Sequence, residues 1–173
     1  MRRLTPDTWL PTCVERMTEA DLETVLDIEE ASFASSWPRE TFLGELDNNL
    51  AHLFVARLTG GEWHGRIAGY CCTWVVVDEM HITSFAVHPD FRRHHIGYQL
   101  LAAVLARAVE LQCCSAVLEV RASNRAAQRL YSQFGFAPVA VRKRYYTDDQ
   151  EDAIVMFLSD IAGQLPPQPG PTS

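Results

Sequence analysis

The chain has 173 residues, of which 47% are hydrophobic and 21% are charged, and its formal net charge is −7. These values fit one domain with a buried core and exclude a chain that is disordered throughout. The negative charge disfavours a broad nucleic-acid-binding surface, so we expect no direct nucleic-acid partner. No apolar run approaches the about 20 residues that cross a bilayer, and no secretory signal follows Met1. We therefore expect a cytoplasmic protein with no membrane partner.

The elements expected in chain order alternate between strands and helices. A capping box, Thr18 followed by Asp21, begins the first helix. Proline suits a first helical turn, so Pro38 marks the second helix, while Asn124 caps the last helix and Gly135 ends it. Apolar runs predict strands at residues 13–17, 53–58, 66–77, 80–87, 116–120, 139–146 and 152–158. Helical spacing predicts helices at residues 18–33, 35–48, 98–111 and 125–134.

This order predicts an α/β fold, in which a mixed central sheet of about seven strands carries helices on both faces. We expect three parts: an N-terminal arm at 1–12, one domain at 13–160 and a Pro-rich tail at 161–173. The tail contains the run PPQPGP, whose composition predicts disorder.

The five cysteines are Cys13 and two adjacent pairs, at 71–72 and 113–114. Adjacent residues of a strand point to opposite faces, so the first pair is a poor metal chelate. Free thiols are the favoured interpretation, and we expect no metal site. A catalytic cysteine is the alternative, although no histidine lies at a recognisable spacing from one. His52, His64, His81 and His88 also lack ligand spacing, and we expect them to be surface or turn residues.

The segment from Arg92 to Gly97 links a strand to a long helix. Backbone N–H groups at a helix N-terminus point outward, and the helix dipole favours anions there. A turn of successive N–H groups can bind phosphate oxygens, and the side chains of Arg92 and Arg93 can add charge around them. The loop predicts a phosphate-bearing ligand, and a solvated basic turn is the alternative.

This loop resembles the Q/R-x-x-G-x-G/A loop of GNAT-family acetyltransferases, which holds the pyrophosphate of coenzyme A. It reads RRHHIG here, with His95 in place of the first glycine. Glycine tolerates a positive φ, so His95 either adopts a negative φ or carries a cost, and the site is altered or weakened. An added positive charge near the phosphates is the alternative effect. The resemblance implies that acetyl-CoA contacts Arg93, His94, His95, Ile96, Gly97 and Tyr98.

A second block, LEVRASN at 118–124 followed by Leu130-Tyr131 and FGF at 134–136, resembles the RimI-type branch of the GNAT family. These enzymes acetylate the N-terminal alanine of a small-subunit ribosomal protein. A third block, RYY at 144–146 with EDA at 151–153, resembles the closing hairpin of the same group. The resemblance covers about residues 14–158, which is nearly the whole chain.

The resemblance assigns chemical roles to several positions. It implies that Glu119 is the general base and that Tyr131 is the general acid, with a core aromatic as the alternative for Tyr131. A carboxylate in the apolar run at 116–120 is itself unusual. Asn124 is implied as a cofactor contact, for which helix capping is the structural alternative. The strand Phe85-Ala86-Val87 is implied to contact acetyl-CoA through its backbone, beside a splay in the sheet.

The acceptor is expected to be a protein N-terminus. A terminal α-amine has a pKa of about 7.7–8.0, against about 10.4 for lysine, so one carboxylate is an adequate base for it. The resemblance implies that Tyr145 and Tyr146 line the peptide entry, and an edge pair of aromatics is the alternative. Phe33 and Trp37 are expected to form the other wall. These features predict acetyl transfer from acetyl-CoA to a protein α-amine, the partner being a ribosomal protein. A GNAT enzyme for small amines and a catalytically silent acetyl-CoA-binding module are the alternatives.

Overall fold

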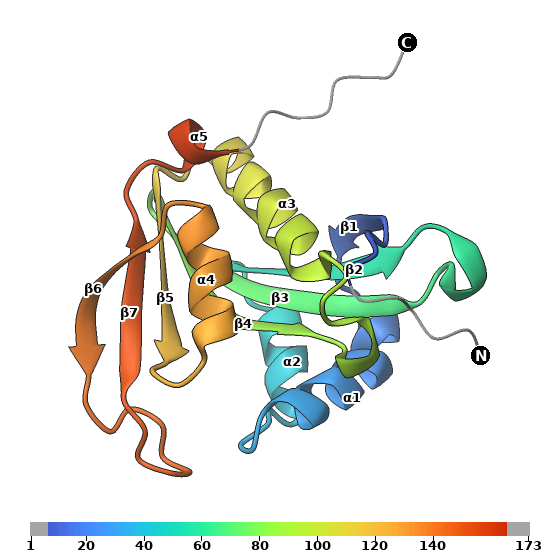
Figure 1. Ribbon diagram of the computed structural model, residues 1–173, viewed down its shortest axis with the longest axis horizontal. Coiled ribbons are helices and arrows are strands. Elements are labelled where there is room, and N and C mark those ends of the chain that lie inside the picture. The colour runs from blue at the N-terminus through green and yellow to red at the C-terminus, as the bar shows by residue number, and fades with distance from the viewer. Residues whose placement is uncertain (1–6, 166–173) are drawn as a thin grey trace.

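Within residues 7–165, which the computed structural model describes, seven strands form one sheet in the order β1-β2-β3-β4-β5-β7-β6 (Figure 1). Neighbouring strands are antiparallel, except that β4 and β5 are parallel. The strands are β1 Thr12–Arg16, β2 Ala51–Leu58, β3 Ile67–Val76, β4 Glu79–Val87, β5 Ser115–Arg121, β6 Ala137–Arg142 and β7 Ala153–Leu158. The helices are α1 Leu22–Ser32, α2 Arg39–Leu46, α3 Ile96–Glu110, α4 Arg125–Gln133 and α5 Ile161–Gln164, with short 3-10 turns η1 Glu19–Asp21, η2 Gly61–Trp63 and η3 Pro89–Phe91. The predicted α/β fold with a mixed sheet is confirmed.

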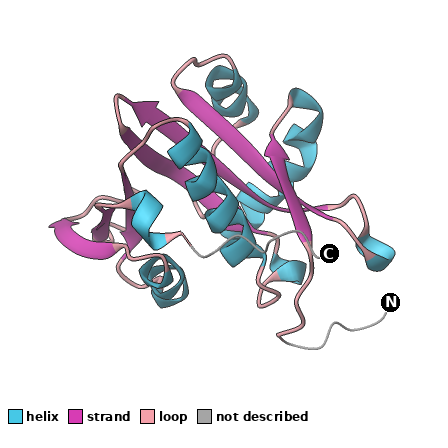
Figure 2. Cartoon of the chain, turned by 90° about the horizontal axis from the view of Figure 1, so that it is seen from above, coloured by secondary structure: helices cyan, strands magenta, loops and turns pink. Residues whose placement is uncertain are grey.

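Two hydrophobic cores lie on opposite faces of this sheet, because successive side chains of a strand alternate between faces. One core packs under α3 and α4, and the other packs under α1 and α2. The view from above shows helices flanking the sheet on both sides (Figure 2). In β3, Cys71 belongs to the α3 core and Cys72 to the α1 core, as adjacent strand residues should.

A bulge interrupts the regular pairing of β3 with β4. Cys72 pairs with Ser84, whereas the next residue, Thr73, pairs with Ile82, so Thr83 is the extra residue in β4. A bulge of this kind bends its strand and increases the local twist. The strand therefore changes direction immediately after Ile82.

The parallel pairing of β4 with β5 ends at the same place. It covers residues 79–82 of β4 and residues 115–118 of β5. Beyond it, β4 continues to Val87 paired with β3, and β5 continues to Arg121 paired with β7. The two strand ends diverge, so the sheet is splayed open between them.

At both ends of the domain, the ordered structure extends beyond the predicted boundaries. Residues 7–11 of the predicted arm run along the start of α3, and β1 begins at Thr12. At the other end, Ile161 is buried and begins α5, so the ordered chain continues past the predicted boundary at 160. The remaining tail prediction, for residues 166–173, lies outside the described residues.

Several predicted element bounds are wrong. The helix predicted at 35–48 is α2, which begins at Arg39 after Pro38 as its N-cap and ends at Leu46. The strand predicted at 139–146 is β6, which ends at Arg142 because the chain turns at once, with Arg144 at a φ of 51°. The helix predicted from residue 98 begins at Ile96. No helix in the described part of the chain is long and apolar enough to span a membrane.

The packing of this sheet can be tested by replacing each of two glycines with alanine. A Cβ on Gly69 of β3 would lie 2.9 Å from the carbonyl oxygen of Ala86, whereas a Cβ on Gly44 of α2 meets nothing within 4 Å. We expect Gly69→Ala to destabilise the protein by about 1–3 kcal/mol, because overpacking forces the backbone to shift. Gly44→Ala should stabilise it by up to about 1 kcal/mol, because alanine favours helix. Urea unfolding of both variants measures the difference, and equal effects would contradict the predicted packing.

Candidate active site

Glu119 lies on the face of β5 that looks away from α3 and α4. Its neighbours Leu118 and Val120 are buried in the α3 core, so Glu119 projects to the other side, where 9% of its side chain is exposed. His81 projects from β4 on the same face and donates a hydrogen bond from Nε2 to Glu119 Oε2, at 2.6 Å. The register pairs His81 with Val117, so this contact lies at the point where β4 and β5 separate.

The electrostatic surroundings of Glu119 favour its ionised form. The hydrogen bond from His81 lowers the pKa of Glu119 most, burial opposes this effect, and the charges of His81 and Arg142 lower it further. Arg142 Nη2 lies 3.5 Å from Glu119 Oε1. Glu119 is therefore a carboxylate at neutral pH and can accept a proton.

Tyr131 of α4 lies in the core on the opposite face of the sheet. Its ring packs against Phe85 of β4 and Phe136, with centroid distances of 6.0 and 5.8 Å. Burial raises the pKa of Tyr131, so its hydroxyl keeps its proton at neutral pH. The aromatic contacts expected for Tyr131 as a core residue are present, and they hold its protonated phenol beside β4.

The positions of Glu119 and Tyr131 on opposite faces have a consequence for any shared substrate. A closed sheet would separate the two side chains by its own thickness. The pairing of β4 with β5 stops beside both of them, since Phe85 follows the bulge and Glu119 follows the last paired residue, Leu118. A reacting group that meets both side chains must therefore lie in the splay.

Residues 92–97 form the loop between η3 and α3, and its backbone is unusual. Arg93 and His95 have φ values of 67° and 62°, in the left-handed region that few side chains adopt. His95 thus bears the conformational cost that the sequence predicted as one of two outcomes. Within the described residues, the backbone N–H groups of residues 93–98 donate no hydrogen bond outside the helix ladder. Such free N–H groups at a helix start form an anion-binding concavity.

The basic side chains of this loop turn away from it. Arg92 donates to the carbonyl of Val87 at 3.0 Å and to Ser32 Oγ at 3.1 Å. Arg93 pairs with Asp7 at 3.4 Å, and His94 is buried. The guanidinium of Arg92 thus joins β4 to α1, and the expectation that it adds charge around a phosphate stays a prediction.

The other predicted cofactor contacts lie around the same opening. Phe85, Ala86 and Val87 form the end of β4 that has no pairing with β5. Gly97 is the second residue of α3, where a Cβ would lie 3.2 Å from Leu130 of α4, so its lack of a side chain permits close packing. Ile96 and Tyr98, its neighbours in α3, pack toward the core.

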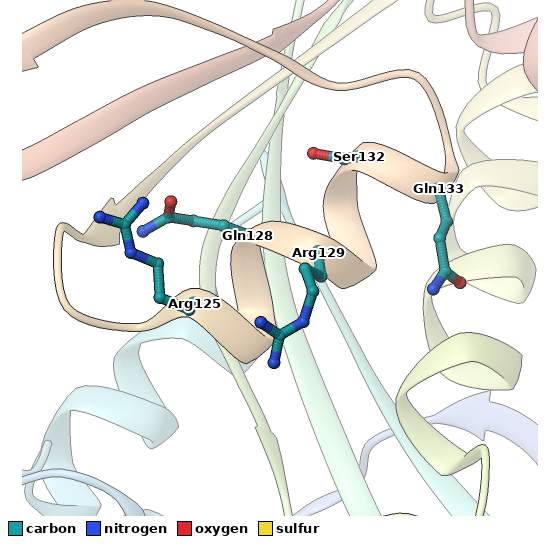
Figure 3. A pocket seen from close by; sticks show the side chains of 5 residues that line it. All are labelled: Arg125, Gln128, Arg129, Ser132 and Gln133. Atoms are coloured by element: carbon teal, nitrogen blue, oxygen red, sulfur yellow. The ribbon is translucent and has the colours of Figure 1, made fainter.

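Asn124 caps a helix, which was the structural alternative to its predicted contact with the cofactor. Its Oδ1 accepts a hydrogen bond from the N–H of Ala127 at 3.1 Å, which caps α4. The exposed side of α4 carries an open depression of about 550 Å³, whose side chains all project from this one helix (Figure 3). It is lined by Arg125, Gln128, Arg129, Ser132 and Gln133. None of the predicted site residues lines it, so we assign it no chemistry.

Tyr145 and Tyr146 lie in the turn after β6, not in a strand. Their rings meet edge to face at 5.1 Å. Arg121 at the end of β5 fixes this turn: its guanidinium lies 4.0 Å from the Tyr146 ring centroid. Burial raises the pKa of Tyr146 to about 12, and the charge of Glu119 contributes to the rise. Arg142, which lies 3.5 Å from Glu119 Oε1, also lies 5.7 Å from the Tyr145 ring centroid and thus links the aromatic pair to Glu119.

Phe33 and Trp37 lie in the connection between α1 and α2, on the Glu119 side of the sheet, and pack against the α1 core. The buried carboxylate of Glu29 accepts a hydrogen bond from the N–H of Trp37 at 2.9 Å. Trp37 also packs on Phe42, with ring centroids 5.5 Å apart. Both residues are partly buried, and they occupy the same face as Glu119.

The sequence did not predict three residues of the site. The expectation that His81 is a surface or turn residue is wrong, because it lies within β4 and binds Glu119. Arg142 and Arg121 were also missed. Arg121 binds the carboxylates of Asp148, Asp149 and Glu151 at 2.7–3.1 Å. The LEVR run places Glu119 and Arg121 on one strand face, but the strand register that adds His81 is not visible in one sequence.

The cysteines do not support the alternative of a catalytic thiol. Burial raises the pKa of Cys71 and of Cys72, and both lie inside the cores, away from Glu119. A thiol with a raised pKa is a poor nucleophile. Among residues 7–165, no group of three or more histidine, cysteine, aspartate or glutamate side chains is placed to hold a metal ion.

Known proteins match this chain over most of its length. A Bacillus subtilis protein, provisionally named a ribosomal protein bS18-alanine N-acetyltransferase, is 39% identical over 147 residues, covering 84% of this chain and 94% of the relative. The Escherichia coli K12 enzyme of that name is 32% identical over 147 residues, covering 84% and 95%. The crystal structure of the Escherichia coli ribosomal-protein-S18-alanine N-acetyltransferase aligns with a TM-score of 0.76 over 86% of this chain and 93% of that one. Arabidopsis thaliana NAA60 in complex with acetyl-CoA, at 18% identity, shares the fold with a TM-score of 0.77 over 86% and 99%.

The family model that matches is the acetyltransferase (GNAT) family, and it covers residues 22–136. That range contains the splayed strands β4 and β5, the loop before α3, and both Glu119 and Tyr131. The match therefore includes the elements from which the site is built, apart from β6, which carries Arg142, and the turn after it. The chain belongs to the GNAT family of acetyltransferases.

Proposed function

We propose that this enzyme transfers the acetyl group of acetyl-CoA to the N-terminal α-amine of a protein, the N-terminal alanine of ribosomal protein bS18. The observation that carries the proposal is the His81–Glu119 pair on one face of the splay, with Tyr131 on the other. The names of the relatives support the substrate, since they are at least 30% identical over most of the chain. A ribosomal protein as substrate places the reaction in the cytoplasm.

The residues present fit acetyl-CoA. The free N–H groups of residues 93–98 suit a pyrophosphate, because two adjacent phosphates need several donors and no acceptor. Past the bulge, the side of β4 that faces β5 has no strand partner, and apart from the carbonyl of Val87, which accepts from Arg92, its backbone groups suit the amides of a pantetheine arm. When bound, acetyl-CoA supplies the activated acetyl group as a thioester.

Glu119 is the proposed general base. An α-ammonium cannot attack a carbonyl, so the amine must lose a proton, directly or through one water, to the carboxylate. His81 holds the carboxylate in place, and together with Arg142 it keeps Glu119 ionised. At neutral pH roughly a tenth of a terminal α-amine is already neutral, which makes a weak base adequate.

Tyr131 is the proposed general acid. The leaving thiolate needs a proton, and the raised pKa of Tyr131 keeps the phenol hydroxyl protonated until that step. Phe85 and Phe136 both pack against the ring, and these contacts fix the orientation of the hydroxyl. Holding both reactants in the splay supplies the rest of the rate enhancement.

The walls of the Glu119 side favour a peptide over a small amine. Arg121 holds Tyr146 and Arg142 holds Tyr145 on one side, and Trp37 and Phe33 come from the α1–α2 connection on the other. We propose that the first residues of the substrate pass between these aromatic pairs. A small amine offers no surface for either wall.

The proposed function is tested with two peptides of one sequence. One begins with a free alanine and contains no lysine, and the other is N-terminally blocked with one internal lysine. We expect thiol release from acetyl-CoA with the first peptide only, and mass spectrometry should place the acetyl group on its α-amine. Acetylation of the blocked peptide at an equal rate would contradict the proposal, and binding of acetyl-CoA without turnover on either would support a silent module.

We expect Glu119→Gln to lower kcat by at least about 10²-fold, because it removes the base. The lowered pKa of wild-type Glu119 keeps it a carboxylate throughout about pH 6–9, so the deficit should be largest at low pH, where the amine is most protonated. The affinity for acetyl-CoA should not change. Steady-state kinetics across this range, with calorimetric titration of acetyl-CoA, measures all three quantities.

The matched control is Glu79→Gln, because Glu79 is a carboxylate at the other end of the β4–β5 pairing and binds Ser115 Oγ at 3.4 Å. Its kcat should stay within about twofold of wild type. Wild-type activity of Glu119→Gln across the whole pH range would exclude Glu119 as the base.

We expect Tyr131→Phe to slow turnover about a hundredfold without unfolding the domain, because it removes the acidic hydroxyl and keeps the ring contacts. Single-turnover kinetics measures the chemical step, and thermal unfolding measures stability. A large drop in Tm with normal turnover would assign Tyr131 to the core alone.

A further inference from the structure

The arm formed by residues 7–12 is bonded to the loop that precedes α3. The N–H of Asp7 donates to the carbonyl of Arg93 at 3.1 Å, and the N–H of Leu10 donates to the carbonyl of His94 at 3.3 Å. In the other direction, His94 Nδ1 donates to the carbonyl of Thr8 at 3.0 Å. The arm and the loop therefore run beside each other, joined by these hydrogen bonds and by the ion pair between Arg93 and Asp7.

Gln99, in the first turn of α3, ties the same arm to the helix. Its Nε2 donates to the carbonyl of Leu10 at 2.8 Å, and its Oε1 accepts from the N–H of Thr12 at 3.0 Å. The arm is thereby anchored at both its middle and its end, where it enters β1. These contacts fix its position relative to the helix start.

Trp9 contributes the only ring stacking of this arm among the described residues. Its indole stacks on the imidazole of His95, with centroids 4.9 Å apart and planes inclined by 21°. It also meets the ring of Tyr98 edge-on at 6.3 Å. Trp9 is 52% exposed, and the ring on which it stacks is that of His95.

The hydrogen bonds of the arm determine which way the loop's N–H groups point. In a trans peptide, the C=O of one residue and the N–H of the next point in opposite directions. The carbonyls of Arg93 and His94 both face the arm, so the N–H groups of His94 and His95 face away from it. The arm therefore leaves the N–H groups of His94 and His95 free to meet a ligand.

We propose that residues 7–12 form a strap that positions the loop for the pyrophosphate of coenzyme A, and that the stacking of Trp9 on His95 stabilises the left-handed backbone which glycine would adopt unaided. The inference rests on the proposed role of residues 93–98 as the pyrophosphate site. Trp9 and Gln99 are positioning residues, since they act through the loop and not on the reacting atoms.

The test compares two acetyl donors, acetyl-CoA and S-acetylpantetheine, which lacks the pyrophosphate. We expect Trp9→Ala to lower kcat/KM for acetyl-CoA about three- to tenfold, chiefly through KM, and to leave kcat/KM for S-acetylpantetheine unchanged. Gln99→Leu should act in the same way, because it frees the arm from α3. Thermal unfolding checks that both variants are folded.

A double-mutant cycle isolates the contact with His95. In a His95→Gly background the loop adopts its backbone conformation without strain, so adding Trp9→Ala should have little further effect on acetyl-CoA. The matched control is Glu110→Gln, which removes an exposed ion pair with Arg107 at the far end of α3, away from the strap and the loop. It should match wild type with both donors.

The outcomes distinguish failure of the proposed strap from failure of the proposed pyrophosphate site. Equal losses with both donors, or additive effects in the cycle, would overturn the strap alone. An unchanged KM for acetyl-CoA in Trp9→Ala would do the same. If the wild-type enzyme used both donors with equal kcat/KM, the pyrophosphate site would fail, and the strap would fail with it.

Discussion

The end of pairing between β4 and β5 is the constraint on which the rest of the site depends. Two parallel strands that stayed together would leave Glu119 and Tyr131 on separate faces with a closed sheet between them. The bulge at Thr83 bends β4 where the pairing stops, and it also shifts the alternation of its side chains. Met80 and Ile82 face the α3 core before the bulge, and Phe85 faces it afterwards. One inserted residue thus opens the sheet and brings Phe85 against Tyr131.

The sequence predicted the parts of the fold that local chemistry determines. Periodicity, caps and breakers identified the elements, and the block from 118 to 136 identified Glu119 and Tyr131. It could not predict His81, because the partner of Glu119 depends on the register between β4 and β5, 38 residues apart in the chain. The end of β6 was missed for a related reason. Val139 to Tyr146 is rich in β-formers, but the turn tied by Arg121 to three carboxylates overrides that preference.

The loop before α3 shows a similar balance between local and distant effects. Local sequence reasoning correctly gave two outcomes for His95, a negative φ or a cost. The choice between them depends on residues 7–12, which lie about 85 positions earlier in the chain yet bond to the loop carbonyls. A residue such as His95, whose side chain disfavours a positive φ, can be held in that conformation by contacts from a distant part of the chain. A short sequence motif does not contain those contacts.

The electrostatics of Glu119 also bear on the choice of substrate. A carboxylate whose pKa is lowered by His81 and Arg142 is a weaker base than an isolated one. Each pKa unit between donor and acceptor costs about 1.4 kcal/mol, so taking a proton from lysine costs about 3 kcal/mol more than taking it from a terminal α-amine. A base held in its ionised form by two neighbours therefore suits an amine that is already partly neutral at pH 7. In its proposed role as the base, Glu119 would therefore activate a narrower range of amines, because His81 and Arg142 hold it in place as a carboxylate.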